Sequence, residues 1–136
     1  MHEEDYTYTA TDGTCAYDSG NATPAKTTGY TSVTGSNVDA MKSALSGQPL
    51  SVSIQANQLC FQFYSSGVFT NTKCGTSLDH ATLVVGWGVD ATAGEYWIMK
   101  NSWATSWGED GYMRLQIIPG DGLCGIQMEP LYPNVA

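Results

Sequence analysis

The middle of the chain reads LDHATLVVGWGVDATAGEYWIMKNSWATSWGEDGY, from Leu78 to Tyr112. Within it, residues 81–88 are almost continuously apolar, which favours a strand covered on both faces. Residues 95–100 and 111–118 are further strand candidates, separated by a segment rich in turn-forming residues. This stretch therefore predicts a mostly antiparallel sheet.

One helix is predicted before this stretch, over residues 37–46. Ser36 or Asn37 can supply the N-cap oxygen, apolar residues follow at helical spacing, and Gly47 ends the run. Residues 50–55 then alternate apolar and small polar side chains, as a half-buried strand does. One helix followed by strands places the chain in the α+β class, predominantly antiparallel β.

The whole chain, residues 1–136, is predicted to be a single domain, because its length suits one domain and 42% of its residues are hydrophobic. Composition distinguishes three parts: an extended, loop-rich lead-in (1–35), the helix (36–47) and a β-rich region (49–136).

Composition also argues against several classes of function. The net charge is −8 and only five residues are Lys or Arg, so nucleic-acid binding, which needs several neutralised phosphates, is not expected. No segment approaches the roughly 20 apolar residues of a membrane span, and no targeting signal is expected in this chain. With two histidines and no C-x-x-C pair, neither a metal site nor another cofactor is expected.

Four widely spaced cysteines allow three complete pairings, and sequence alone does not choose among them. They are Cys15, Cys60, Cys74 and Cys124. Asn21-Ala22-Thr23 forms a glycosylation sequon, which together with the cysteines favours an oxidising compartment. The alternative is a chance tripeptide.

His80 is the only histidine away from the N-terminus, and it opens the most apolar predicted strand. Imidazole titrates near neutrality and is the usual general base for activating a thiol or hydroxyl. Asn101 offers an amide oxygen that can hold one imidazole nitrogen, and the indole of Trp103 can shield such a contact from water. Taken alone, these residues also fit a core histidine and a turn with aromatic anchors.

The order and spacing of several motifs decide between these interpretations. They are Leu78-Asp79-His80-Ala81, Val85-Gly86-Trp87-Gly88, Tyr96-Trp97-Ile98-Met99-Lys100-Asn101-Ser102-Trp103 and Trp107-Gly108-Glu109-Asp110-Gly111-Tyr112, with Tyr8-Thr9-Ala10, Asp12-Gly13-Thr14-Cys15, Cys124-Gly125-Ile126 and Tyr132-Pro133 towards the ends. Together they resemble the C-terminal half of the papain (cathepsin L-like) family of cysteine proteases, over essentially the whole chain.

This resemblance implies a role for each matching residue. His80 is similar to the catalytic base, Asn101 to the residue that orients its imidazole, and Trp103 to the shield of that contact. Trp107 and Gln62 would flank the site on the leaving-group side of the scissile bond.

The resemblance also implies a pocket for the substrate residue two before that bond, lined by Ser53, Leu78, Ala81 and Glu129. Family members with an acidic residue at the place of Glu129 accept basic as well as apolar side chains, since a carboxylate can pair with an arginine. The alternative for Glu129 is a solvated surface charge.

Two departures from the family's pattern bear on function. Nothing in the chain matches the segment that supplies the nucleophilic cysteine and the oxyanion glutamine, so we expect this chain alone to be inactive. Ala104 stands where the family usually has glycine, which matters only if the backbone there needs a positive φ.

By resemblance, Cys74 and Cys124 form a disulfide, which would stabilise the fold by about 3–4 kcal/mol by closing a loop of roughly 50 residues. Cys15 matches a cysteine whose usual partner lies in the half of the family's sequence without a counterpart here. Three states stay open for it: free, bonded to Cys60, or crosslinked to a second chain. Cys60 is disfavoured as a substitute nucleophile, because no helix start that would lower its pKa is predicted there.

The leading interpretation is the C-terminal half of a cysteine endopeptidase that acts on peptides or proteins. Its partners would be an N-terminal half or an inhibitory propeptide, in a secreted or lysosomal/vacuolar parent protein. The alternatives are a non-catalytic module that binds partners or self-associates through the exposed domain interface, and a purely structural or storage role. The implied fold is an antiparallel sheet closed into a barrel-like domain, with the helix on its flank.

Overall fold

The computed structural model describes residues 1–22 and 26–135. Its elements, in chain order, are η1 (Ser19–Asn21), β1 (Thr27–Ser32), α1 (Val38–Leu45), β2 (Leu50–Ile54), α2 (Leu59–Gln62), β3 (Val68–Phe69), η2 (Thr72–Cys74), β4 (His80–Asp90), β5 (Gly94–Lys100), β6 (Tyr112–Gln116), η3 (Leu123–Gly125) and β7 (Leu131–Val135). Thr23, the last residue of the predicted sequon, lies outside the described residues. Within the described part of the chain, no helix has the length and apolar character needed to cross a bilayer.

The chain divides into two compact units, Met1–Gly29 with Pro133–Ala136, and Tyr30–Tyr132. The described residues of the first unit are mostly extended and exposed, with the short η1 as their helical turn. The second unit holds both α-helices, the central strands and the hydrophobic core. That all 136 residues act as a single domain stays a prediction.

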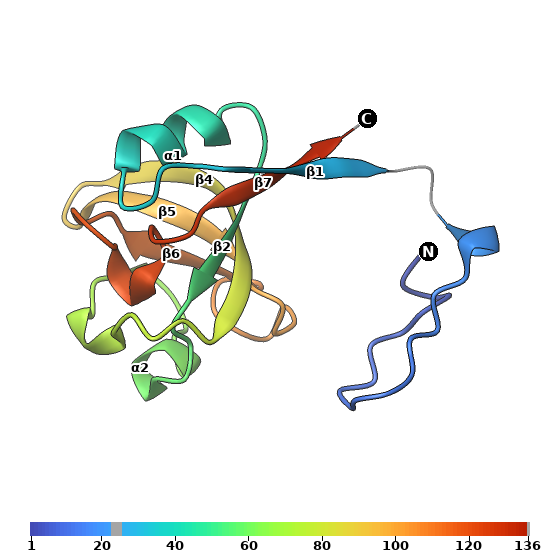
Figure 1. Ribbon diagram of the computed structural model, residues 1–136. Coiled ribbons are helices and arrows are strands. Elements are labelled where there is room, and N and C mark those ends of the chain that lie inside the picture. Colours follow the sequence, from blue (N-terminus) through green and yellow to red (C-terminus); the bar gives the residue numbers. More distant parts are fainter. Residues whose placement is uncertain (23–25, 136) are drawn as a thin grey trace. The chain divides into compact units, whose positions relative to one another are not determined.

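The sheet has seven strands in the order β1-β7-β2-β4-β5-β6-β3. The pairs β2–β4, β4–β5 and β5–β6 are antiparallel, whereas the two-residue β3 pairs with β6 in parallel. The predicted α+β class with a predominantly antiparallel sheet is confirmed. Closure of the sheet is not seen, because the hydrogen-bonded ladder ends at β1 and β3 (Figure 1).

The predicted helix is confirmed as α1, which packs against β2 and β4 (Figure 1). Its N-cap is Asn37, whose side-chain oxygen accepts a hydrogen bond from Ala40 N at 2.9 Å. Met41 and Leu45 are buried one turn apart, so the apolar face that was read from the sequence is the face that enters the core.

One face of each central strand packs into the hydrophobic core. In β2, Leu50, Val52 and Ile54 are buried while the intervening serines are half-buried, as the period of two requires. The prediction that residues 81–88 are covered on both faces is wrong, since Trp87 is 39% exposed. The reason is that β2 pairs only with the first residues of β4, so the rest of this strand has β5 as its neighbour.

One polar side chain lies at the centre of this core. Gln127 is fully buried, and its amide nitrogen donates to the carbonyl oxygens of Ile118 and Gly120 at 3.0 and 2.6 Å. Its side-chain oxygen accepts a hydrogen bond from Trp97 Nε1 at 3.1 Å. The side chain thus ties β5 to the segment that follows β6, and its polar groups are satisfied.

Candidate active site

The strand register brings His80 and Asn101 together, although 21 positions separate them in sequence. His80 is the first residue of β4, and Asn101 directly follows the last residue of β5. Because the two strands are antiparallel, with Leu83 opposite Lys100, these strand ends lie at the same edge of the pair. The distance between His80 Nε2 and Asn101 Oδ1 is 2.9 Å.

A backbone contact identifies the atom of Asn101 that faces the imidazole. Ser102 N–H donates to Asn101 Oδ1 at 2.8 Å, and a backbone N–H requires an oxygen acceptor. The bond to His80 is therefore donated by Nε2–H. In the neutral ring Nδ1 is then an acceptor that can take a proton from a reacting group.

Asn101 is itself held in place and buried. Its backbone N–H donates to Gly111 O at 2.9 Å, and its exposed fraction is only 8%. Its Nδ2 has no hydrogen-bond partner among the described residues. Because Asn101 is buried, its hydrogen bond with His80 is largely removed from water, and such a bond is electrostatically stronger than one at the surface.

Trp103 covers the ring of His80. The two rings are stacked, with centroids 5.2 Å apart and an interplanar angle of 30°. Trp103 in turn contacts Trp107 and Phe61 edge-on, at centroid distances of 5.4 and 5.6 Å. The aromatic cluster thus extends from the imidazole into the core, where Phe61 is fully buried.

A shallow pocket of about 270 Å³ opens beside the histidine. Its lining residues are Ala56, Asn57, Gln62, Asp79, His80 and Trp103. Two contacts shape it: Asp79 Oδ1 accepts a hydrogen bond from Ala56 N at 2.7 Å, and Trp107 Nε1 donates to Gln62 O at 2.9 Å. The sequence predicted a role for Gln62 but none for Asp79, although Asp79 belongs to the Leu78-Asp79-His80-Ala81 motif.

The residues expected to line a substrate pocket lie in neighbouring elements. Ser53 and Ala81 are directly opposed in the β2–β4 pair. Leu78 precedes β4, and its side chain lies against Gly125, where a Cβ would come within 2.7 Å of it. Glu129 is exposed, as both of its interpretations require.

Cys74 and Cys124 form a disulfide that joins η2 to η3, with 4.9 Å between their Cα atoms. Cys15 and Cys60 are free cysteines, Cys15 exposed and Cys60 half-buried. The expectation that no helix begins near Cys60 is wrong, because α2 starts at Leu59. That short turn escaped notice because no side chain caps it.

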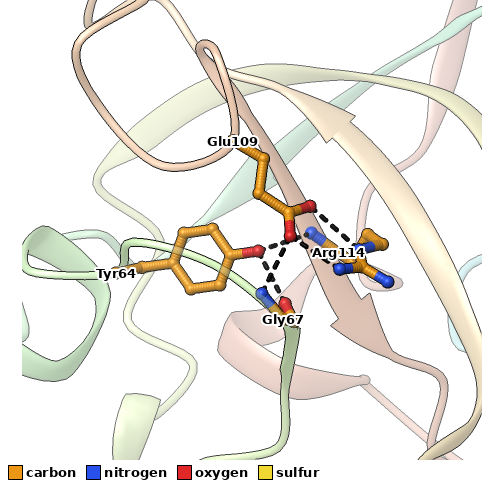
Figure 2. A network of polar contacts seen from close by, with 4 residues as sticks. All are labelled: Tyr64, Gly67, Glu109 and Arg114. Carbon is orange, nitrogen blue, oxygen red and sulfur yellow. Dashed lines mark hydrogen bonds and ion pairs between the residues drawn. The ribbon is translucent and has the colours of Figure 1, made fainter.

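A polar network that the sequence did not predict holds the segment after Trp107 (Figure 2). Glu109 accepts two hydrogen bonds from Arg114, at 2.6 and 2.9 Å, and one from Gly67 N at 2.8 Å. Tyr64 Oη donates to Gly67 O at 2.6 Å. The hydrogen bond from Arg114 holds the pKa of Glu109 below its ordinary value, and burial raises the pKa of Tyr64.

Backbone conformation restricts the loop between Trp103 and β6. Gly108 has a φ of 59°, and a Cβ there would lie 2.5 Å from Tyr112 O, so only glycine fits. Ala104 has a φ of 63°. The replacement of glycine by alanine noted in the sequence therefore falls at a position where a methyl group is strained.

Among residues 1–22 and 26–135, no group of three or more His, Cys, Asp or Glu side chains is placed to hold a metal ion. What the described residues offer at this site is an oriented imidazole beside a shallow pocket.

Comparison with known proteins finds one family over nearly the whole chain. The family model described as "Papain family cysteine protease" matches residues 1–134. Thiol protease SEN102 of Hemerocallis sp. is 47% identical over 133 residues, covering 96% of this chain and 37% of that protein. Senescence-specific cysteine protease SAG12 of Arabidopsis thaliana is 44% identical over 135 residues, covering 98% of this chain and 39% of that protein.

Solved structures give the same result. The bromelain protease from Ananas comosus, solved with an inhibitor, matches with a TM-score of 0.86 and 43% identity, over 97% of this chain and 61% of that one. The Amb a 11 cysteine protease, a ragweed pollen allergen in its proform, matches with a TM-score of 0.86 and 36% identity, over 97% and 36%. Thiol protease SEN102 and senescence-specific cysteine protease SAG12 are much longer than this chain, which spans well under half of the length of each.

Proposed function

Because the chain belongs to the papain family of cysteine proteases, we propose that it supplies the histidine-bearing half of a cysteine endopeptidase. In this proposal His80 is the base, Asn101 orients its ring, and Trp103 keeps water from their contact. The observation that supports it is the 2.9 Å bond between His80 Nε2 and Asn101 Oδ1, beneath a stacked indole.

The nucleophilic sulfur would come from the part of the relatives' length that this chain does not span. His80 Nδ1 would accept the thiol proton, leaving a thiolate that attacks the peptide carbonyl carbon. As the tetrahedral intermediate collapses, His80 would return that proton to the leaving amine, and a thioester remains. Water, deprotonated by the same imidazole, would then release the acid and regenerate the thiol.

The substrate would run on both sides of this histidine. Gln62 and Trp107 would border the residue that follows the scissile bond, because Gln62 lines the pocket beside His80. Ser53, Leu78, Ala81 and Glu129 would receive the residue two before the bond. The exposed carboxylate of Glu129 would then favour arginine or lysine there, in addition to apolar side chains.

The wider assignments are part of the same proposal. The parent protein would be secreted or vacuolar, as its disulfide suits an oxidising compartment. Its partners would be peptide substrates and either the N-terminal half or an inhibitory propeptide. Alone, this chain would be inactive and open to self-association through the face that the other half covers.

Thiol-selective labelling tests the proposal. The chain is incubated with a peptidyl epoxide, alone and after refolding with the N-terminal half of a papain-family protease, and labelled sites are located by mass spectrometry. Labelling of a cysteine in the added half, lost in the His80→Ala variant, is the expected result. Stable association without any labelling would favour a non-catalytic binding module, and specific labelling of Cys60 in the isolated chain would contradict the proposed inactivity.

A further inference from the structure

Two buried side-chain atoms have no hydrogen-bond partner among the described residues. They are Oγ1 of Thr82, which lies in β4, and Nδ2 of Asn101, which directly follows β5. Thr82 is 9% exposed and Asn101 is 8% exposed, so bulk water supplies no partner to either atom. A buried donor or acceptor without a partner destabilises the fold, because its lost contacts with water are not replaced.

The strand register places these two side chains next to each other. Leu83 is opposite Lys100, and one step further along this antiparallel pair Thr82 comes opposite Asn101. Directly opposed residues point to the same face of a sheet, with their Cβ atoms about 4.5–5.5 Å apart. Both residues also line one pocket of about 370 Å³ together with Leu83 and Lys100, which agrees with continued pairing of the two strands.

The other neighbours of Thr82 on this face leave its hydroxyl without a partner. The nearest positions are those two before and two after it in β4 and those opposite it in β2 and β5, which hold His80, Val84, Val52 and Asn101. Val52 and Val84 are apolar and buried, and His80 Nε2 already donates to Asn101 Oδ1. An amide nitrogen donates and a hydroxyl oxygen accepts, so Asn101 Nδ2 is the complementary group.

We infer that Thr82 is a positioning residue whose hydroxyl oxygen accepts a hydrogen bond from Asn101 Nδ2 and so keeps the amide oxygen turned towards His80. The adjustment that this pairing needs is a rotation about the Cα–Cβ bond of Thr82, which moves the hydroxyl between staggered positions. The amide is then held at both ends, since its oxygen already contacts Ser102 N and His80. The catalytic consequence rests on the proposed function, whereas the bond itself does not.

Two substitutions separate the hydroxyl from the rest of the side chain. Thr82→Val removes the hydroxyl and nearly keeps the shape, whereas the matched control Thr82→Ser keeps the hydroxyl and loses a methyl group. The side-chain amide protons of Asn101 are observed by NMR in isotope-labelled chain, and their signals are assigned by their absence from Asn101→Ala. In Thr82→Val one of these protons should lose the downfield shift of a hydrogen-bonded proton, and in Thr82→Ser it should keep that shift. Identical amide signals in all three chains overturn the inference.

The positioning role is tested in the complete enzyme, with this chain joined to the N-terminal half of a papain-family protease. Thr82→Val should lower kcat/KM roughly three- to tenfold, as loss of one hydrogen bond allows, and Thr82→Ser should keep the unaltered rate. In an Asn101→Ala background Thr82→Val should have no further effect, because the two residues act as one unit. Equal losses with valine and serine, or an undiminished effect of valine in that background, overturn the inference. Failure of the unaltered enzyme to cleave peptides would instead contradict the proposed function, and the amide signals would still decide whether the bond exists.

Discussion

Replacing Glu109 by glutamine should cost this chain about 1–2 kcal/mol of unfolding free energy at pH 7. The change keeps the shape of the side chain but removes its charge and one of its acceptor oxygens. Glu109 accepts three hydrogen bonds, two from Arg114 and one from Gly67 N. A hydrogen bond to a charged group contributes about 1.5–3 kcal/mol to stability, against roughly 1 kcal/mol for a neutral one. Glu109 is 27% exposed and Arg114 is 32% exposed, so solvent screens part of that difference.

The penalty should depend on pH in a defined direction. The hydrogen bond from Arg114 lowers the pKa of Glu109 in the folded chain, so ionisation of this carboxyl stabilises the fold. That stabilisation is complete above the unfolded pKa of about 4.3 and is lost as the pH falls through the lower folded pKa. Protonated Glu109 resembles glutamine, so the difference between Glu109→Gln and the unaltered chain should shrink towards zero well below pH 4.

The assay is urea unfolding followed by tryptophan fluorescence at pH 7 and pH 3, with the slope of the transition checked for constancy. The matched control is Glu95→Gln, which removes an ion pair with Lys42 of the same 2.6 Å length but with Glu95 48% exposed. The control should cost no more than about 0.5 kcal/mol. Equal penalties for Glu109→Gln at both pH values, or an equal loss in the control, would refute the reasoning.

Other substitutions test other parts of the structure. In the complete enzyme, Asn101→Ala should lower kcat/KM roughly 10- to 100-fold, because the imidazole of His80 loses its orienting partner; an unchanged pH–rate profile and rate would contradict this role. Ala104→Gly should raise stability by roughly 0.5–1 kcal/mol, since relief of strain at the positive φ of this residue outweighs the greater freedom of glycine in the unfolded chain, whereas Ala104→Val should cost about 1–2 kcal/mol in urea unfolding. Gln127→Leu should cost about 2–4 kcal/mol by the same measurement, because Trp97 Nε1–H and two carbonyls lose their partner in the core.

Local patterns predicted the elements with strong periodicity or clear caps. The helix predicted over 37–46 is α1, since Asn37 caps it and Gly47 follows it as expected. The alternation of residues 50–55 likewise gave the correct face of β2. The apolar run at 81–88 misled because β2 pairs with β4 only as far as Val84, so the far end of β4 is an edge of the sheet where Trp87 stays partly exposed.

The sequence predicted the main residues of the candidate site but not the contacts that hold the neighbouring segment in place. His80 and Asn101 stand out by chemistry and motif, and an antiparallel pair of strands is enough to bring them together. The network around Glu109 depends on Gly67 and Arg114, which come from different elements and form no local pattern. The strain at Ala104 is a backbone property that only coordinates reveal.

The central claim is that Asn101 fixes His80 with its proton on Nε2 and leaves Nδ1 free to accept one. Long-range nitrogen–proton NMR correlation of histidine-labelled chain at pH 9, where imidazole is neutral, reports the tautomer directly. The account predicts a single Nε2–H form for His80 that becomes a mixture of both tautomers in Asn101→Ala. A dominant Nδ1–H form in the unaltered chain, or spectra indifferent to the substitution, would contradict it.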